Sequence, residues 1–220
     1  MIDLGELKPF ASGGNRHCYR HPQDPEKCVK VMRTGRIEEL HARAPWYKRL
    51  AGNDRFDDNL RELAGYQQPA LRNADDHSPV WRHLARWYGL EETSAGRAAV
   101  SQLILDENGN PAPTLEDYLQ EHGLDAPITA ALEHFAQWLW DTRVLTKNIL
   151  PHNLVVRMHD GAPELVLIDG LGRATLLPLP EWFEFFNRHY IRRRIQRMWR
   201  RIHWEVSDKS LSWKETERHS

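Results

Sequence analysis

Residues 148–170 read NILPHNLVVRMHDGAPELVLIDG, and this stretch decides the fold that we predict. Its two short apolar runs, Leu-Val-Val and Leu-Val-Leu-Ile, flank the polar turn His159-Asp160-Gly161, a pattern that predicts a β-hairpin. Asn153 precedes the first strand and Asp169 ends the second, so a hairpin brings both side chains to the same end. An amide oxygen and a carboxylate are ligands that Mg²⁺ accepts. The stretch therefore predicts a magnesium site, with an ordinary strand-ending Asp-Gly turn as the alternative.

The chain before this stretch predicts an antiparallel sheet with helices. Apolar runs at 7–10, 16–20 and 27–32 are separated by turn residues, which indicates three strands joined by two tight turns. A helical pattern in two pieces follows over 37–71. Further apolar runs over 79–105 add strands, giving a sheet of about five strands.

The second half of the chain is predicted to be mainly helical. Thr114 is a good N-cap for a short helix that Gly123 ends, and residues 128–144 have the spacing of an amphipathic helix. The hairpin comes next, and a long Arg-rich helix follows it. We expect an α+β protein with two lobes: an N-terminal lobe over 1–105, with an antiparallel sheet and one or two helices, and a reduced helical lobe over 106–220.

Composition bounds what the chain can be. Its 220 residues, 40% hydrophobic and 28% charged, suffice for one domain with two lobes. A formal charge of −1 gives no global electrostatic reason to expect nucleic acid or an anionic membrane as a partner. The sequence has neither a secretory signal at its start nor a run of about 20 apolar residues, so we predict a cytoplasmic protein without a transmembrane segment. Cys18 and Cys28 are interpreted as small buried side chains, with one local disulfide left open.

Three features of the N-terminal half suit phosphate chemistry. The turn around Ser12, Gly13 and Gly14 could bring backbone N–H groups close to a phosphate, although a plain hairpin turn explains it equally well. Lys30 lies between Val29 and Val31, so it points away from two apolar neighbours, into a cleft or into solvent.

Glu62, on the helix that follows, is a suitable partner to hold Lys30 toward phosphates. Glu38 and Glu39 are rivals for that role, and the alternative for Glu62 is one more charge on a solvated helix face.

At this point the sequence resembles the protein-kinase superfamily, and more closely the YrbL family of bacterial proteins, named for a PhoP regulatory network. The resemblance covers nearly the whole chain. It is carried by motifs similar to the glycine-rich loop, the strand with the phosphate-binding lysine, the helix whose glutamate pairs with it, the catalytic loop and the Asp-Phe-Gly segment: Phe10–Tyr19, Cys28–Val31, Arg61–Leu63, Asn148–Asn153 and Leu167–Gly172.

The resemblance implies ATP and Mg²⁺ as cofactors. It makes Lys30 the phosphate-binding residue, Glu62 the residue that positions it, and Asn153 with Asp169 the metal ligands. Ser12, Gly13 and Gly14 become the phosphate-covering turn.

The departures from the kinase pattern affect catalysis. Asn148 occupies the place of the aspartate that accepts the substrate hydroxyl proton, and an amide is not a useful general base. Leu150 replaces the lysine often found in this loop, and Gly13 alone of the three loop glycines aligns. Two hypotheses follow. One is an atypical phosphotransferase acting on a small molecule or a cell-envelope component; the other is a pseudokinase that binds nucleotide or a partner protein within a stress or PhoP-type regulon.

The last helix carries seven arginines among apolar residues at helical spacing. The arginines are Arg188, Arg192, Arg193, Arg194, Arg197, Arg200 and Arg201. They could contact an anionic surface such as lipid headgroups or nucleic acid. The alternative is a solvated basic face that pairs with acidic residues of the same domain.

Overall fold

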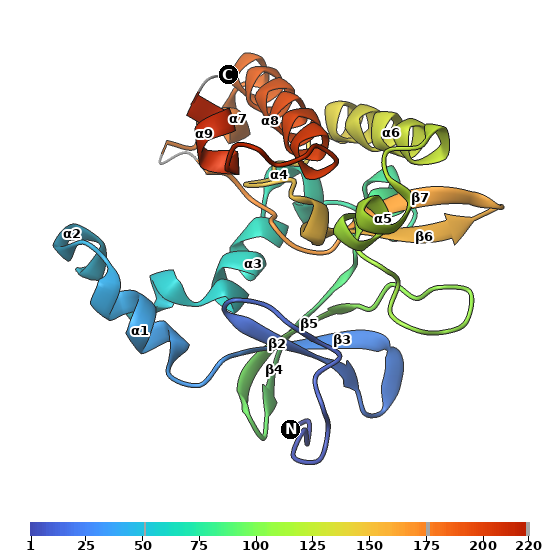
Figure 1. The fold of residues 1–220 in the computed structure, drawn as a ribbon. Helices are drawn as coiled ribbons and strands as arrows, with labels where there is room; N and C mark the ends of the chain where they lie inside the picture. Colours follow the sequence, from blue (N-terminus) through green and yellow to red (C-terminus); the bar gives the residue numbers. More distant parts are fainter. Residues whose placement is uncertain (51, 175–176, 219–220) are drawn as a thin grey trace. The chain divides into compact units, whose positions relative to one another are not determined.

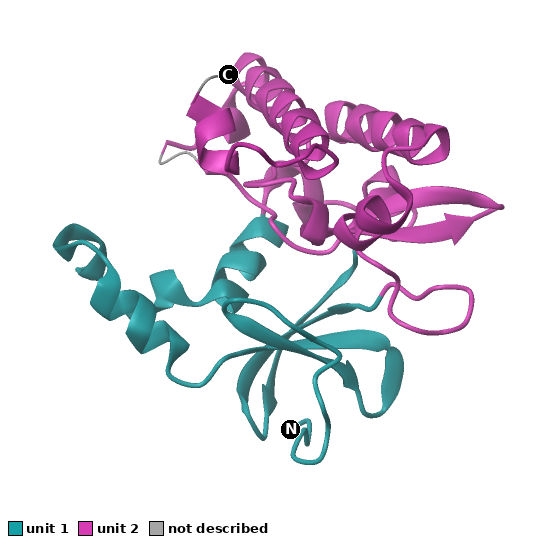
Figure 2. Ribbon diagram, in the orientation of Figure 1, with its two compact units in different colours: residues 1–67, 85–103 teal, residues 68–84, 104–220 magenta. Residues whose placement is uncertain are grey.

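The structure, a computed structural model, describes residues 1–50, 52–174 and 177–218. Its internal contacts divide the chain into two compact units, which Figure 2 colours separately. Unit 1 comprises residues 1–67 and 85–103, and unit 2 comprises residues 68–84 and 104–220. The predicted boundary at residue 105 adjoins the last change of unit, at residues 103 and 104, whereas residues 68–84 belong to unit 2. The assignment of the units to kinase-like lobes stays a prediction.

Unit 1 contains a five-stranded antiparallel sheet with the strand order β1-β2-β3-β5-β4 (Figure 1). The strands are β1 (Ala11–Ser12), β2 (Arg16–His21), β3 (Asp24–Met32), β4 (Trp87–Thr93) and β5 (Gly96–Gln102). One face of the sheet forms an apolar core from Ile2, Leu4, Val29, Val31, Ala98 and Val100. The other face is free to carry polar groups because successive strand residues point to opposite sides.

The helical part of unit 1 lies between β3 and β4. It consists of α1 (Arg36–Arg43), α2 (Trp46–Arg49), the 3₁₀ turn η1 (Asn53–Phe56) and α3 (Asp58–Tyr66). Asp57 caps α3, since its side chain accepts a hydrogen bond of 2.8 Å from the backbone N–H of Asn59. Asp is among the residues preferred at this position, because its carboxylate satisfies a backbone N–H that has no partner within the helix.

Unit 2 is mainly helical and contains a two-stranded hairpin. Its elements are α4 (Pro69–Arg72), η2 (Pro79–His83), α5 (Leu115–His122), α6 (Ala126–Thr142), η3 (Pro151–Asn153), β6 (Leu154–His159), β7 (Ala162–Leu167), α7 (Leu179–Trp182), α8 (Glu184–Glu205) and α9 (Trp213–Arg218). α6 packs against both β7 and α8. Side chains fully buried at this centre, such as Phe135 and Leu165, each contribute about 1.5–3 kcal/mol by leaving water.

The mixed α+β class, the five-stranded sheet, the hairpin and the capped helices were all expected. Thr114 forms a capping box with Asp117, and Gly123 ends α5 as predicted. Two local predictions were wrong. The first strand is Ala11–Ser12 and not 7–10, and the apolar pair Val80-Trp81 lies in η2 because Pro79 starts a 3₁₀ turn there. Among the described residues, no helix is long and apolar enough to cross a membrane.

Candidate functional site

Lys30 and Glu62 form a buried ion pair in unit 1. Val29 and Val31 point into the apolar core, so the strand alternation turns Lys30 to the opposite face of β3. There its Nζ lies 2.7 Å from Oε1 of Glu62, and each residue is only 5% exposed. Burying a charge is costly unless it is paired, so this pair holds both side chains in place.

A second cation shares the same carboxylate. The Arg16 guanidinium, on the neighbouring strand β2 and itself buried, donates to Oε2 of Glu62 and, at 3.2 Å, to Oδ1 of Asn59. Glu62 therefore contacts two cations, one through each of its oxygens.

The helix α3 sets the position of Glu62. Asn59, Glu62 and Tyr66 recur at helical spacing, and all three are buried. The Asn59 amide also donates to the backbone carbonyl of Arg97 at 3.2 Å, which ties α3 to β5. Burial of this face leaves Glu62 directed at the sheet.

The rival acids have other partners or other surroundings. Glu39 pairs with Arg36 at 2.6 Å and with Arg43 at 2.8 Å, and these charges lower the pKa of its carboxyl. Glu38 is exposed. Of the three acids considered as partners, the structure places Glu62 at Lys30.

The turn around Ser12, Gly13 and Gly14 is exposed and open. The backbone N–H of Gly13 donates to the carbonyl of Arg16 at 2.9 Å, and Ser12 Oγ lies 2.8 Å from Nδ1 of His17. A Cβ added at Gly14 would meet no atom within 4 Å, and a Cβ at Gly13 would make only an ordinary contact at 3.9 Å. The protein's own packing therefore does not require these glycines, which leaves close approach of a ligand as a reason for them.

The two cysteines lie beside the lysine. Cys18 pairs with Lys30 across β2 and β3, and both Cys18 and Cys28 are free thiols. The hydrogen bond with Cys18, together with burial, raises the pKa of the Cys28 thiol. Cys28 is buried as expected, whereas Cys18 is half-buried.

In unit 2 the segments around Asn153 and Asp169 are joined by backbone hydrogen bonds. The N–H of Ile168 donates to the carbonyl of Asn153 at 2.9 Å, and the N–H of Lys147 donates to the carbonyl of Gly170 at 2.7 Å. These bonds set the start of β6 beside the end of β7. The hairpin thus brings Asn153 close to the segment that carries Asp169.

Gly170 shows how tightly these segments approach. Its φ is +87°, and an added Cβ would lie 2.7 Å from the carbonyl oxygen of Asn148 and 3.1 Å from Nδ2 of Asn153. A side chain has no room here, so this glycine, unlike those of the exposed turn, is required by the fold. It lets the loop before β6 lie directly against the residue after Asp169.

Both carbonyl oxygens of Asn148, one on the backbone and one on the side chain, accept hydrogen bonds. Nδ2 of Asn153 donates to its backbone oxygen at 3.4 Å, and Nη1 of Arg197, from α8, donates to its side-chain Oδ1. Arg197 also pairs with Glu217 at 2.5 Å. One arginine of the Arg-rich helix therefore reaches the loop in which the sequence placed the catalytic position.

The residues of unit 2 fit a hard cation. With Nδ2 of Asn153 turned to Asn148, the amide Oδ1 is the atom that this side chain would offer to a metal, and Asp169 offers carboxylate oxygens. Oxygen donors of this kind suit Mg²⁺. No group of three or more His, Cys, Asp and Glu side chains that could hold a metal occurs within 1–50, 52–174 and 177–218.

Several residues that build these sites were not predicted. Arg16 follows the glycine turn. It alternates with Cys18 along β2, the strand that pairs with β3, and this alternation was the signal in the sequence that could have identified Arg16. Tyr190 was expected only as core, yet its hydroxyl donates to the carbonyl of Thr146 at 2.8 Å and so anchors the loop to α8. Gln68 bonds both backbone groups of Leu145, a contact between residues 77 positions apart that no local pattern reveals.

Fold and site together define a mixed α+β protein with an antiparallel sheet, a buried Lys–Glu pair, and a loop region of unit 2 in which backbone hydrogen bonds hold the segments of Asn153 and Asp169 together. The chain belongs to the family described as PhoP regulatory network protein YrbL, which matches residues 2–203. It is 28% identical over 206 residues to the proteins named "Uncharacterized protein YrbL" of Escherichia coli (strain K12) and of Shigella flexneri. The alignment with each spans 92% of this chain and 86% of the relative.

Proposed function

We propose that this member of the YrbL family is a kinase-like protein that binds ATP with Mg²⁺ and transfers a phosphoryl group to a small molecule or a cell-envelope component. The observation that carries the proposal is the buried Lys30–Glu62 pair, with its 2.7 Å contact on the polar face of an antiparallel sheet. Kinases use such a pair to hold a lysine for the phosphates of ATP. A solvated lysine would instead be exposed.

Unit 1 carries the residues proposed to bind phosphate. In unit 1, Lys30 supplies a fixed cation for phosphate oxygens, Glu62 holds it, and Ser12, Gly13 and Gly14 supply an open turn. Arg16 is a second buried cation at Glu62, and guanidinium groups bind phosphate oxygens well.

In unit 2, Asn153 and Asp169 would hold Mg²⁺ through their oxygens, and the close packing at Gly170 keeps the two segments together. Bound ATP supplies the phosphoryl group. Rate enhancement in phosphoryl transfer depends mainly on positioning and electrostatic stabilisation, which these fixed groups can provide without a strong base.

A pseudokinase is the second candidate, and Asn148 favours it. An amide cannot accept the proton of an acceptor hydroxyl, and the contact with the Arg197 cation makes proton acceptance there still less favourable. In this alternative the chain binds nucleotide or a partner protein and signals by conformation, within a bacterial stress or PhoP-type regulon.

Thermal unfolding with and without ATP and Mg²⁺ tests nucleotide binding. A ligand that binds the folded state stabilises it by about 2.7 kcal/mol at a concentration of 100 times Kd. We expect ATP with Mg²⁺ to raise the Tm of the wild type, and Lys30→Met and Asp169→Asn to abolish the rise, each measured against its own ligand-free baseline. Lys27→Met is the matched control, because Lys27 lies on the same strand but pairs with the partly exposed Asp24 at 3.0 Å.

The outcomes separate the candidates. A rise in Tm that both site variants lose and Lys27→Met keeps supports the nucleotide site, and labelled phosphate appearing in an acceptor then supports the phosphotransferase. A rise with no turnover of ATP supports the pseudokinase. No rise at millimolar ATP, or an equal rise in Lys30→Met, contradicts the proposed nucleotide site.

A further inference from the structure

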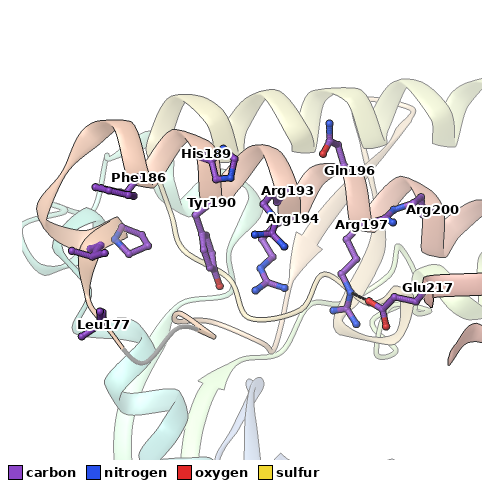
Figure 3. A pocket seen from close by; sticks show the side chains of 12 residues that line it. Leu177, Phe186, His189, Tyr190, Arg193, Arg194, Gln196, Arg197, Arg200 and Glu217 are labelled. Atoms are coloured by element: carbon purple, nitrogen blue, oxygen red, sulfur yellow. Dashed lines mark hydrogen bonds and ion pairs between the residues drawn. The ribbon is translucent and has the colours of Figure 1, made fainter. Parts of the chain in front are cut away.

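Unit 2 contains a cavity of about 1140 Å³ along one face of α8 (Figure 3). Four of its lining residues are arginines of that helix: Arg193, Arg194, Arg197 and Arg200. We call this cavity the basic pocket. Its volume is slightly above the range of about 300–1,000 Å³ that is typical of small-molecule sites, and it is concave, whereas a surface for a membrane or a nucleic-acid backbone would be broad.

The charges in the basic pocket are not balanced. Glu217, from α9, is the one acidic residue that lines it, and it pairs with Arg197 at 2.5 Å. Within the described part of the chain, Arg193 and Arg200 have no carboxylate within ion-pair distance, and Arg194 lies over the Tyr190 ring at 4.7 Å. Among the described residues that line the pocket, four guanidinium groups therefore face one carboxylate.

The other arginines of α8 either pair with an acid of the same helix or do not line the pocket. Arg188 pairs with Glu184 at 3.1 Å and Arg201 pairs with Glu205 at 2.5 Å, each within the helix. Arg192 is exposed and does not line the pocket. The excess positive charge is thus concentrated on the pocket face, which makes a concave anion site a better reading than a uniformly basic helix.

The pKa of the Glu217 carboxyl reflects the positive charges around the basic pocket. The hydrogen bond from Arg197, and the charges of Arg197, Arg200 and Arg194, lower the pKa of its carboxyl. An anion brought in by α9 is therefore stabilised here. Figure 3 shows the Glu217 side chain beside that of Arg197, where an oxygen of an external anion would bind in the same way.

The pocket also has an uncharged end. Leu177, Pro180 and Phe186 line it together with the arginines. Planar guanidinium groups match phosphate oxygens in a bidentate manner, whereas an apolar wall suits the organic part of a ligand.

We propose that the basic pocket binds a small organic compound that carries two or more phosphate groups, and that Glu217 occupies part of this site when the compound is absent. Arg193, Arg197 and Arg200 hold the phosphates. Arg197 also contacts Asn148, so the bound phosphates lie next to the candidate catalytic loop. The proposal does not depend on nucleotide binding at Lys30.

Calorimetric titration with inorganic tripolyphosphate, without Mg²⁺ and at about 50 mM salt, tests the pocket. We expect Arg193→Gln and Arg200→Gln each to weaken binding roughly ten- to hundredfold, the effect of losing hydrogen bonds to a charged group. Glu217→Gln should strengthen binding because it removes the internal competitor. Arg192→Gln is the matched control on the same helix and should change binding less than about twofold. Circular dichroism checks that each variant keeps its helices.

Two results would overturn the pocket: no binding of tripolyphosphate to the wild type at millimolar concentration, or an equal loss in Arg192→Gln and Arg193→Gln. In a Lys30→Met background, Arg193→Gln should still weaken tripolyphosphate binding, whereas the rise in Tm with ATP and Mg²⁺ depends on Lys30. Failure of the nucleotide site and failure of the basic pocket therefore give different results.

Vesicles that contain cardiolipin, whose headgroup carries two phosphates, separate a lipid headgroup from a soluble phosphate. If the protein sediments with the vesicles and tripolyphosphate reverses this, the phosphates belong to a headgroup held in the same pocket. If the protein does not sediment, they belong to a soluble compound. Vesicle binding that tripolyphosphate leaves unchanged, and that requires Arg192, contradicts the proposal.

Discussion

Glu62 should matter more to stability than either cation that it pairs with. Glu62 contacts Lys30 at 2.7 Å and also accepts from Arg16, and all three residues are at least 93% buried. At an effective dielectric constant of about 20, two unit charges at that distance attract each other by about 6 kcal/mol, much of which offsets desolvation. Glu62→Gln removes the negative charge from both cations. Lys30→Met leaves the carboxylate with Arg16.

We therefore expect Glu62→Gln to lower the free energy of unfolding by about 3–5 kcal/mol, the cost of breaking a buried ion pair from one side. Lys30→Met should cost less, roughly 1–3 kcal/mol. Urea unfolding at pH 7 measures both values, and hydrogen exchange of peptides from α3 and β3 shows whether the loss is local. Equal losses in the two variants, or a loss of less than about 1 kcal/mol in Glu62→Gln, as for a surface pair, would refute the shared-carboxylate reasoning.

Two further predictions concern unit 2. Gly170→Ala should destabilise the protein by roughly 1–3 kcal/mol, because alanine at φ +87° is strained and its Cβ would overlap the carbonyl oxygen of Asn148; denaturant unfolding that matches the wild type would contradict this. His83 is buried, and burial lowers the pKa of its imidazole, so the unfolded chain binds its proton at a higher pH than the folded protein does. Stability should therefore fall as the pH drops below about 6.5, and a pH series of urea midpoints should show a smaller fall in His83→Gln.

Local patterns were sufficient for much of the architecture. The hairpin of β6 and β7, the capping box at Thr114 and the long helix α8 depend on neighbours within a few residues, and the sequence displays such neighbours directly. The strand at Val80 was wrong because a short apolar run does not distinguish a strand from a 3₁₀ turn. Near the end of the chain the short helix α9 forms, and its Trp213 lies against Trp204 with ring centroids 6.1 Å apart, a contact that no local pattern displays.

The candidate sites also depend partly on local patterns and partly on long-range packing. The alternation of apolar and charged residues in β3 fixed the face on which Lys30 lies, and the helix α3 made Glu62 a candidate partner. The choice among Glu38, Glu39 and Glu62 depended on which helix packs on the sheet. Only long-range packing decides that.

The sequence by itself determined which residue types are present and which face of each element they occupy, because periodicity and capping are local properties of the chain. Tertiary structure alone decided that Arg16 shares Glu62 with Lys30, and that Arg197 connects Asn148 to Glu217. These contacts join residues 46, 49 and 20 positions apart. Burial of apolar surface in each unit brings these distant residues together. This force has no direction of its own, so a short stretch of sequence shows which side chains are buried but not which segment they pack against.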